Sequence, residues 1–519
     1  MKLERSKNSA RNILFGTVTR AFNLIVPFFM RTLIIYVLGV EYIGLDSLFI
    51  SILQVLNLAE LGVGYALVYS MYEPLAKDDT EKICALLLLY KKYYRIIGFV
   101  ILGAGIILTP FLPLLIKGDV PDGINLYLLY YLNLLSTVVS YLFFSYKISI
   151  ITLYQRNDIV DKVRLITSAI KYTLQFLVLW LFHNYYFFII VALSSEVLAN
   201  YISYLIVNKY FPQYKAEGKL SKKEVSLINH RARDLFTAAF GSVVVDSADT
   251  IVISAFLGLT SLALFQNYYF VITTIIGVIT LITNSALAGI GNSIVTETKE
   301  KNYSDMKKLT FVFCWIGIFS VCCLLCAVQP FVKIWVGKEN LLPYSLVICF
   351  CVYLFVKIIN SLLNTYKDAA GLWHIDRFRP LVTAMSNLTM NLIMVQFWGL
   401  FGILISTIIS MLFIGMPWLL YNLFSFLFTN KKIKEYLFVL LNYSIICVVL
   451  GIASALLISK IELNSIVFTI IVRITVCACM NIAVLLIVFG KTSEFCSLIH
   501  YADKVTNGKF GFLFKRLGL

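Results

Sequence analysis

The sequence predicts an all-α integral membrane protein with about fourteen transmembrane helices. Of its 519 residues, 60% are hydrophobic and only 14% are charged, and the mean hydropathy of +0.85 exceeds that of soluble domains. Apolar segments of roughly 20 residues, the length that crosses a bilayer, follow one another with short polar joints. Little sequence remains for a soluble domain.

The expected spans follow from these apolar runs. They are residues 13–38, 42–71, 94–116, 125–149, 164–183, 186–208, 235–258, 262–294, 310–332, 342–366, 381–398, 400–425, 436–458 and 465–489. The first run is too long for a signal-peptide core and no small-residue cleavage site follows it. We therefore expect an uncleaved first span.

Basic residues alternate between the two ends of these spans. Of the 44 lysines and arginines, 34 fall in the two tails and in every second loop, and only four fall in the intervening loops. This positive-inside pattern predicts that both termini are cytoplasmic and that the number of spans is even. The net charge of +16 thus orients the chain in a membrane and does not indicate a nucleic-acid partner.

An internal repeat divides the chain into two lobes. The segments "YVLGVEYIGLDSLFIS" and "AFLGLTSLALFQNYYF" place Leu38-Gly39 and Leu257-Gly258 at the same turn after the first and the seventh span, 219 residues apart. The longest polar loop lies between the two blocks. The predicted divisions are a first lobe over 1–208, a cytoplasmic loop over 209–234, a second lobe over 235–425, two further spans within 436–489 and a cytoplasmic tail over 490–519.

Three stretches carry a resemblance to a known family: "TRAFNLIVPFFMRTLIIYVLG" with the following "VEYIGL", "LAELGVGYAL" (58–67) and "SADTIVISAFLG" (247–258). With them the chain resembles the polysaccharide-transporter branch of the multidrug/oligosaccharidyl-lipid/polysaccharide (MOP) exporter superfamily, and most closely its Wzx-type flippases. The resemblance implies two six-helix lobes around a central cavity that opens alternately to each side. It also implies two C-terminal helices, which in lipid II flippases frame a groove for the lipid tail.

The resemblance further implies a function. A protein of this kind would move undecaprenyl-pyrophosphate-linked oligosaccharide repeat units from the cytoplasmic to the outer leaflet of the bacterial cytoplasmic membrane, driven by a cation gradient or the membrane potential. Its partners would be membrane lipids and the polymerase and glycosyltransferases of the same pathway. Whether the units belong to O-antigen, capsule, exopolysaccharide or a teichoic-type polymer stays open.

Two arginines in the first span suggest how such a cargo is held. Arg20 and Arg31 are eleven residues apart, which places them about 20° from the same angular position and about 16 Å apart along a helix. Guanidinium groups can hold a pyrophosphate through paired hydrogen bonds, and Pro27 between them is expected to act as a hinge. The alternative is that both side chains reach the membrane surfaces as snorkelling residues.

Other ionisable residues inside predicted spans also need a partner or an aqueous cavity, because each costs about 2.5–3.5 kcal/mol on insertion scales. Lys171 and Lys357 are expected to attract a diphosphate in each lobe, with snorkelling as the competing interpretation. Asp246 and Asp249, three residues apart on one helix, have three open roles: counter-charge to a span-one arginine, proton acceptor or Na⁺ ligand. Glu60 and Glu196 are candidates for the same roles.

The remaining candidates and alternatives are weaker. Asn267, Tyr268 and Asn284 are possible sugar contacts in the eighth span, although most aromatic residues of such a chain belong to the core. The pattern calls for no metal site, and for no cofactor beyond a coupling Na⁺ or H⁺. A cation-coupled multidrug exporter of the same superfamily is the main alternative, for which an acidic cavity would be expected. A membrane polymerase or glycosyltransferase is disfavoured, because the outer loops are short and no P-loop or nucleophile elbow is present, so no enzyme is expected.

Overall fold

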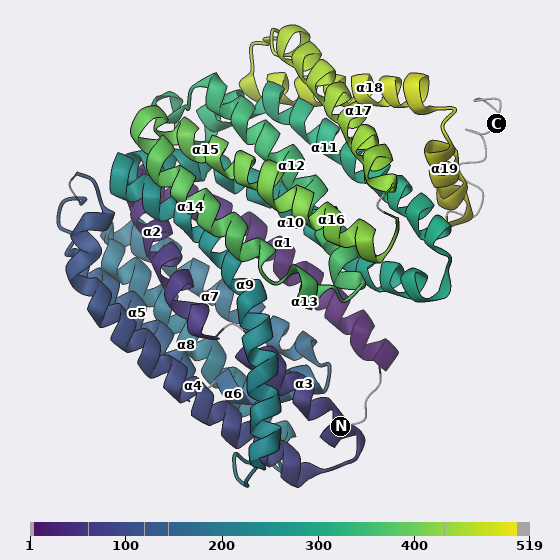
Figure 1. Cartoon of the computed structure of the whole chain (residues 1–519). Helices are drawn as coiled ribbons and strands as arrows, with labels where there is room; N and C mark the ends of the chain where they lie inside the picture. Colours follow the sequence, from purple (N-terminus) through teal and green to yellow (C-terminus); the bar gives the residue numbers. More distant parts are fainter. Residues whose placement is uncertain (1–4, 61, 119, 144, 430, 506–519) are drawn as a thin grey trace. The chain divides into compact units, whose positions relative to one another are not determined.

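The computed structural model describes residues 5–60, 62–118, 120–143, 145–429 and 431–505; some side chains within the helices, that of Asp246 included, lie outside the described set. Every regular element in these ranges is a helix (Figure 1), which confirms the predicted all-α class. Eleven of the described helical segments have the length and hydropathy of a membrane span. The chain is a multi-pass membrane protein.

Eleven of the fourteen predicted spans coincide with these eleven segments, and the other three fall on helices that are not among them. The predicted span over 42–71 is divided into α2 (Glu41–Leu56), a 3₁₀ turn η1 (Asn57–Glu60) and α3 (Val63–Ala76). Gly62 at this break has a φ of +88°, a left-handed conformation that glycine adopts without a steric penalty. The predicted span 235–258 falls on α9 (Lys222–Leu257) and ends one residue beyond it, and the predicted span 381–398 lies within α14 (Arg379–Trp398).

The chain forms two compact units, which divide it differently from the predicted lobes. The first unit comprises residues 1–266 and 391–399, and the second comprises 267–390 and 400–519. The predicted loop over 209–234 is shorter in the structure, because a capping box of Ser221 and Glu224 starts α9 at Lys222. α9 packs along α2 and α3 and therefore belongs to the first unit.

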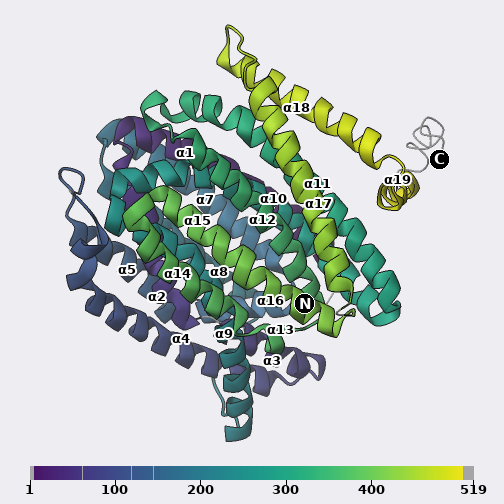
Figure 2. The same ribbon diagram turned by 45° about the horizontal axis from the view of Figure 1, so that its top comes forward.

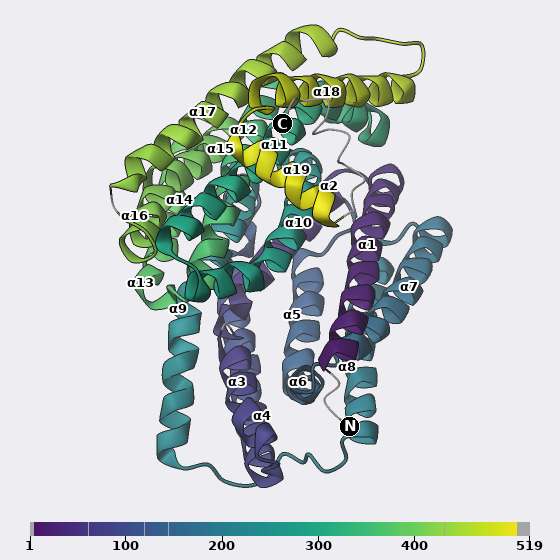
Figure 3. The same ribbon diagram turned by 90° about the vertical axis from the view of Figure 1, so that its right-hand side faces the viewer.

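The first unit is built from α1–α9 with the ends of two further helices. Its remaining elements are α1 (Arg5–Val37), α4 (Thr80–Leu108), η2 (Thr109–Leu115), α5 (Leu126–Phe143), α6 (Ser145–Leu153), α7 (Asn157–Phe182), α8 (Tyr185–Tyr210), the start of α10 (Leu259–Thr296) and the end of α14. α1 lies along α7, as Figure 3 shows, and α7 in turn packs against α8. The charged side chains of α1 thereby come near those of α7.

The turns at the two Leu-Gly repeats have the same backbone character. Gly39 after α1 has a φ of +126° and Gly258 after α9 has a φ of +88°, where a side chain would be strained. A Cβ atom on Gly258 would also lie 2.7 Å from the carbonyl oxygen of Lys117. Glycine is therefore required at the second turn for both its conformation and its close packing.

The second unit contains the rest of α10 and the C-terminal helices. Its other elements are α11 (Lys299–Val336), η3 (Lys338–Asn340), α12 (Tyr344–Ala369), α13 (Trp373–Asp376), the start of α14, α15 (Leu400–Ile409), the π-helical turn η4 (Ser410–Gly415), α16 (Met416–Phe426), α17 (Lys432–Ala453), the π-helical turn η5 (Ser454–Ile458), α18 (Ile466–Phe489) and α19 (Ser493–Val505). α17 and α18 both pack on α11 (Figure 2). Arg473 of α18 stabilises the packing of α18 on α11 by donating a 2.8 Å hydrogen bond to the carbonyl oxygen of Cys326.

Each predicted lobe contains a buried aspartate shortly before its fifth predicted span. In the first unit Arg156 donates a 2.7 Å hydrogen bond to Asp158, and the Asp158 amide donates to Asn12 of α1. In the second unit Arg379 holds Asp376 through its Nε and Nη2 atoms. The two aspartates are 218 residues apart in sequence, close to the spacing of the Leu-Gly repeat.

Candidate functional site

Four ionisable residues on four helices of the first unit lie near enough to influence one another electrostatically. Asp46 of α2 interacts with Arg31 of α1 and with Lys171 of α7, and Lys171 interacts in turn with Glu196 of α8. Arg31, Asp46 and Lys171 are half-buried, whereas Glu196 is exposed. The structure thus brings together three residues that were predicted separately and adds Asp46, which the sequence did not single out.

Aromatic side chains surround these ionisable residues. The Nζ atom of Lys171 lies 4.1 Å from the centroid of the Tyr172 ring, close enough for a cation–π attraction. Tyr185 is 3% exposed, lies under the electrostatic influence of Asp46 and packs edge-on against Tyr42 with ring centroids 4.9 Å apart. The site therefore has alternating charge and several polar rings, the groups that recognise a charged head group and sugars.

Arg20 lies elsewhere on the same helix and in different surroundings. α1 is continuous through Pro27, so Arg20 and Arg31 retain the shared helical face that their spacing predicts. Arg20 is exposed and interacts with Asp161 of α7, whereas Arg31 interacts with Asp46. The two arginines of α1 thus have different acidic neighbours on different helices. The hinge at Pro27 stays a prediction.

Asp249 of α9 forms its own polar contact within the first unit. Its Oδ1 atom accepts a 2.6 Å hydrogen bond from Nδ2 of Asn391 on α14. At the next residue of α9, Gln266 donates to the hydroxyl of Thr250. Asp249 thus lies in a polar stretch of α9 and accepts from an amide of α14. Asp246, the second predicted acid of this helix, lies outside the described side chains.

Glu60 is held by tyrosines at the break in the second span. Tyr94 donates a hydrogen bond to one carboxylate oxygen of Glu60 and Tyr141 donates to the other. The hydroxyl of Tyr90 donates in turn to that of Tyr94 over 3.1 Å. A carboxylate has acceptor sites on both oxygens, and tyrosine hydroxyls occupy both of them at the point where the helix is interrupted.

The predicted residues of the second unit have less uniform surroundings. Tyr268 is 2% exposed; its hydroxyl donates to Gln329 and accepts from the backbone amide of Leu342. Both hydrogen-bonding capacities of this hydroxyl are used inside the unit. Asn267 is likewise buried, and the sugar contacts of Tyr268 and Asn267 stay a prediction. Asn284 is exposed, and Lys357 is half-buried on α12.

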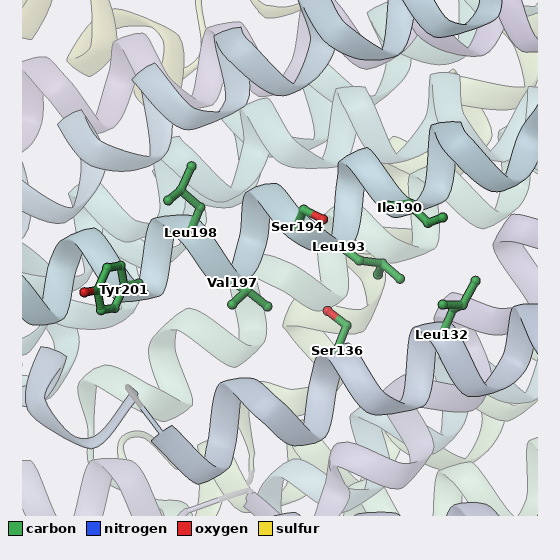
Figure 4. Close-up of a pocket in the computed structure, with 8 residues that line it drawn as sticks. All are labelled: Leu132, Ser136, Ile190, Leu193, Ser194, Val197, Leu198 and Tyr201. Carbon is green, nitrogen blue, oxygen red and sulfur yellow. The ribbon is translucent and has the colours of Figure 1, made fainter. Parts of the chain in front are cut away.

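An apolar groove of about 460 Å³ lies between α5 and α8 (Figure 4). Leucine, isoleucine and valine side chains line most of it, with Tyr201 and the hydroxyls of Ser136 and Ser194 as its polar groups. Such a lining suits a hydrocarbon chain.

The fold has known counterparts, although no family model and no curated protein matches the sequence. The lipid II flippase MurJ in its inward closed conformation matches with a TM-score of 0.64 and 18% identity over 92% of this chain and 99% of that chain. An inward-facing MATE family multidrug transporter of the MOP superfamily matches with a TM-score of 0.58 and 13% identity over 80% of this chain and 96% of its own. A MOP superfamily transporter from Pyrococcus furiosus matches with a TM-score of 0.53 and 12% identity over 82% and 96%.

These likenesses establish the fold as that of MOP superfamily transporters. All three matched proteins are flippases or transporters rather than enzymes by their descriptions. The matched part of this chain is larger for the lipid II flippase than for the other two.

Proposed function

We propose that this protein is a flippase that moves undecaprenyl-pyrophosphate-linked oligosaccharide units from the cytoplasmic to the outer leaflet by alternating access. The observation that carries the proposal is the extent of the match to the lipid II flippase, 92% of this chain against 80% for the MATE transporter. α17 and α18 both have the length and hydropathy of membrane spans. Two such helices beyond a twelve-span core favour a cargo with a lipid tail.

Before the cargo binds, the Asp46 carboxylate would supply the negative charge that the cargo's diphosphate later supplies. In the structure its carboxylate lies under the influence of both Arg31 and Lys171. A diphosphate carries more charge than a carboxylate and accepts forked hydrogen bonds from a guanidinium. The diphosphate would therefore compete with Asp46 for Arg31 and Lys171. When the head group binds, the electrostatic attraction of Asp46 on α2 to α1 and α7 would be lost.

The coupling ion would bind at a carboxylate away from this cluster. Asp249 with Asn391 and Glu60 with its tyrosines are the two described arrangements that fit. Protonation of Glu60 would put a donor on one of its two oxygens while the carbonyl oxygen still accepts, so the hydrogen bond from the tyrosine at the protonated oxygen would weaken. Na⁺ would instead favour Asp249, whose carboxylate supplies oxygen ligands of the kind that hard cations prefer.

A cation-coupled multidrug exporter is the second candidate, and the tyrosine-surrounded Glu60 favours it, because aromatic rings and a carboxylate attract lipophilic cations. Both oxygens of Glu60 are already occupied by tyrosine hydroxyls, which weakens this alternative. A polymerase or glycosyltransferase has no supporting observation.

Reconstitution separates these candidates. Liposomes containing the purified protein would be loaded in the inner leaflet with a prenyl-diphosphate oligosaccharide, and its appearance outside would be followed with a membrane-impermeant lectin. We expect lectin binding above the rate of empty liposomes, no comparable export of ethidium, and loss of flipping in Arg31→Gln and Lys171→Gln. Export of ethidium without flipping would overturn the proposal and support the exporter.

A further inference from the structure

Outside the site described above, three cations gather where α4, α6 and α8 meet in the first unit. Lys147 of α6 is only 9% exposed, and its ammonium group donates to the side-chain oxygen of Asn208 on α8. It also lies 5.2 Å from the ring centroid of Tyr204. Lys91 of α4 contacts the neighbouring residue of α6: its Nζ atom lies 5.6 Å from the Tyr146 ring centroid. We call Lys91, Arg95 and Lys147 the α4–α6 basic cluster.

The charge of this cluster is not balanced within the protein. Lys91 and Lys147 repel each other electrostatically, and Arg95, one turn beyond Lys91, interacts with Tyr146. Among the described residues, none of the three forms an ion pair with a carboxylate. A buried ammonium with only an amide oxygen and aromatic faces as partners is costly unless an anion approaches it.

The hydropathy of the span that carries Lys91 and Arg95 indicates the depth of these two residues in the membrane. The span formed by α4 and η2 is 36 residues long, whereas about 20 residues cross the hydrocarbon core. Its charged residues all lie before Ile96, and the rest is apolar. Lys91 and Arg95 therefore lie at the edge of the hydrocarbon, on the side that the positive-inside pattern predicts to be cytoplasmic.

Orientation of the chain in the membrane does not explain this arrangement. A lysine that serves only the positive-inside rule can remain in water, as Lys92 does: it is exposed, although it is the next residue after Lys91. Lys91 and Lys147 are instead drawn inward onto tyrosine rings. Their inward position calls for a ligand.

We infer that the α4–α6 basic cluster binds the phosphoryl head group of a lipid. Tetrahedral phosphate oxygens can accept from Lys147 and Lys91 together and from the guanidinium of Arg95 at the membrane surface. The ligand chemistry is shared by two sources, a prenyl diphosphate and an anionic phospholipid. The inference does not depend on the proposed transport activity, since it concerns binding alone.

Binding to the purified full-length protein tests the inference. The probes are inorganic pyrophosphate, a prenyl diphosphate and phosphatidylglycerol, each titrated in detergent and followed by native mass spectrometry. We expect Lys147→Met to weaken binding of the phosphoryl probes at least tenfold, Lys147→Arg to retain most of it, and the matched control Lys92→Met to have no effect. Loss of prenyl diphosphate binding alone identifies the cargo as the source, whereas loss of phosphatidylglycerol binding as well identifies any anionic lipid.

Thermal unfolding without ligand provides the second measurement. Because Lys147→Met removes a buried charge and keeps the length of the side chain, the variant is expected to unfold at the same or a higher temperature than the parent. Unchanged binding of all three probes by Lys147→Met would overturn the inference. So would a lower unfolding temperature with undiminished binding, since the lysine would then be structural.

Discussion

Nδ2 of Asn391 donates a 2.6 Å hydrogen bond to Oδ1 of Asp249, joining α14 to α9 within the first unit. Hydrogen bonds to charged groups contribute about 1.5–3 kcal/mol. We expect Asn391→Ala to lower the unfolding free energy by roughly that amount, and Asp249→Asn to remove the dependence of transport on the cation gradient. Flipping measured with imposed Na⁺ or pH gradients checks this. The control is Thr389→Val on an exposed position of the same helix; an ion dependence that survives in Asp249→Asn would exclude Asp249 as the coupling residue.

The roles of Arg31 and Arg20 can be tested by substitution. Replacement of either by alanine is expected to abolish display of the surface polymer without loss of protein from the membrane. For Arg31→Lys we expect partial activity, because lysine keeps the charge but loses the planar fork that a diphosphate recognises. Polymer on the cell surface and protein in the membrane fraction are the two measurements, with Lys77→Ala at an exposed pair as control. Full display from both alanine variants would refute the hypothesis that Arg20 and Arg31 hold the pyrophosphate.

The link between Asp46 and Arg31 predicts non-additive stability. Asp46→Asn alone leaves Arg31 and Lys171 without their shared counter-charge, and Arg31→Gln alone leaves Asp46 with Lys171 only. The double variant should therefore be more stable than the sum of the two single effects predicts, by about 0.5–3 kcal/mol. Thermal unfolding of the four proteins in one detergent gives the coupling energy. Strict additivity would mean that the two side chains do not interact.

Removal of a buried charge should cost far more than removal of an exposed one in the second unit. Asp376 is 2% exposed and bonds Arg379 and Asn422. Asp376→Ala leaves Arg379 buried and is expected to destabilise the protein by about 3–5 kcal/mol. The exposed pair of Lys301 and Asp305 provides the control, with an expected loss below about 1 kcal/mol for Lys301→Ala. Unfolding temperatures measured side by side decide between the two expectations.

The start of α9 predicts a small acid dependence. The hydrogen bond from Lys82, together with those from Ser221, lowers the pKa of Glu224 to about 2. A depressed carboxyl pKa contributes stability above the ordinary value of 4.5, and this contribution is lost as the pH falls from there through about 2. Because the Glu224 side chain is 37% exposed, solvent screening keeps the Lys82 contribution below about 1 kcal/mol.

Lys82→Met should therefore raise the pKa of Glu224 and weaken the acid dependence below pH 4.5. Thermal unfolding at pH 7 and pH 3, in low and in high salt, measures the effect. High salt should reduce the difference between parent and variant. A large effect that salt does not change would contradict a surface ion pair.

Much of the fold could be predicted because hydropathy reports membrane crossings directly. Eleven of the predicted spans correspond to long apolar helices, and both repeated Leu-Gly turns have glycines of positive φ. The break at Gly62 was not predicted, because its flanking residues are apolar enough to read as one continuous span. The start of α9 was missed for the opposite reason: its first turns are polar and look like a loop, although the capping box Ser221–Glu224 is a visible signal.

The candidate site was predictable only in part. Intramembrane charges such as Arg31 and Lys171 stand out against an apolar background, but the sequence does not show which of them face each other. Asp46 was passed over because it is close to a predicted interface, and its importance depends on the packing of α2 near α1 and α7. The burial and hydrogen bonds of Tyr268 could not be predicted either, because a buried tyrosine with satisfied hydrogen bonds has the same sequence signature as a sugar contact.

The division of the second crossing at Gly62 has a consequence for biogenesis. α2 has 16 residues and α3 has 14, so each is shorter than the roughly 20 residues that cross a bilayer alone. Both pack against α9, which is synthesised more than 140 residues later. The contacts of both short helices with α9 can therefore form only after α9 has been synthesised, and the packing of this crossing is completed late in the synthesis of the first unit.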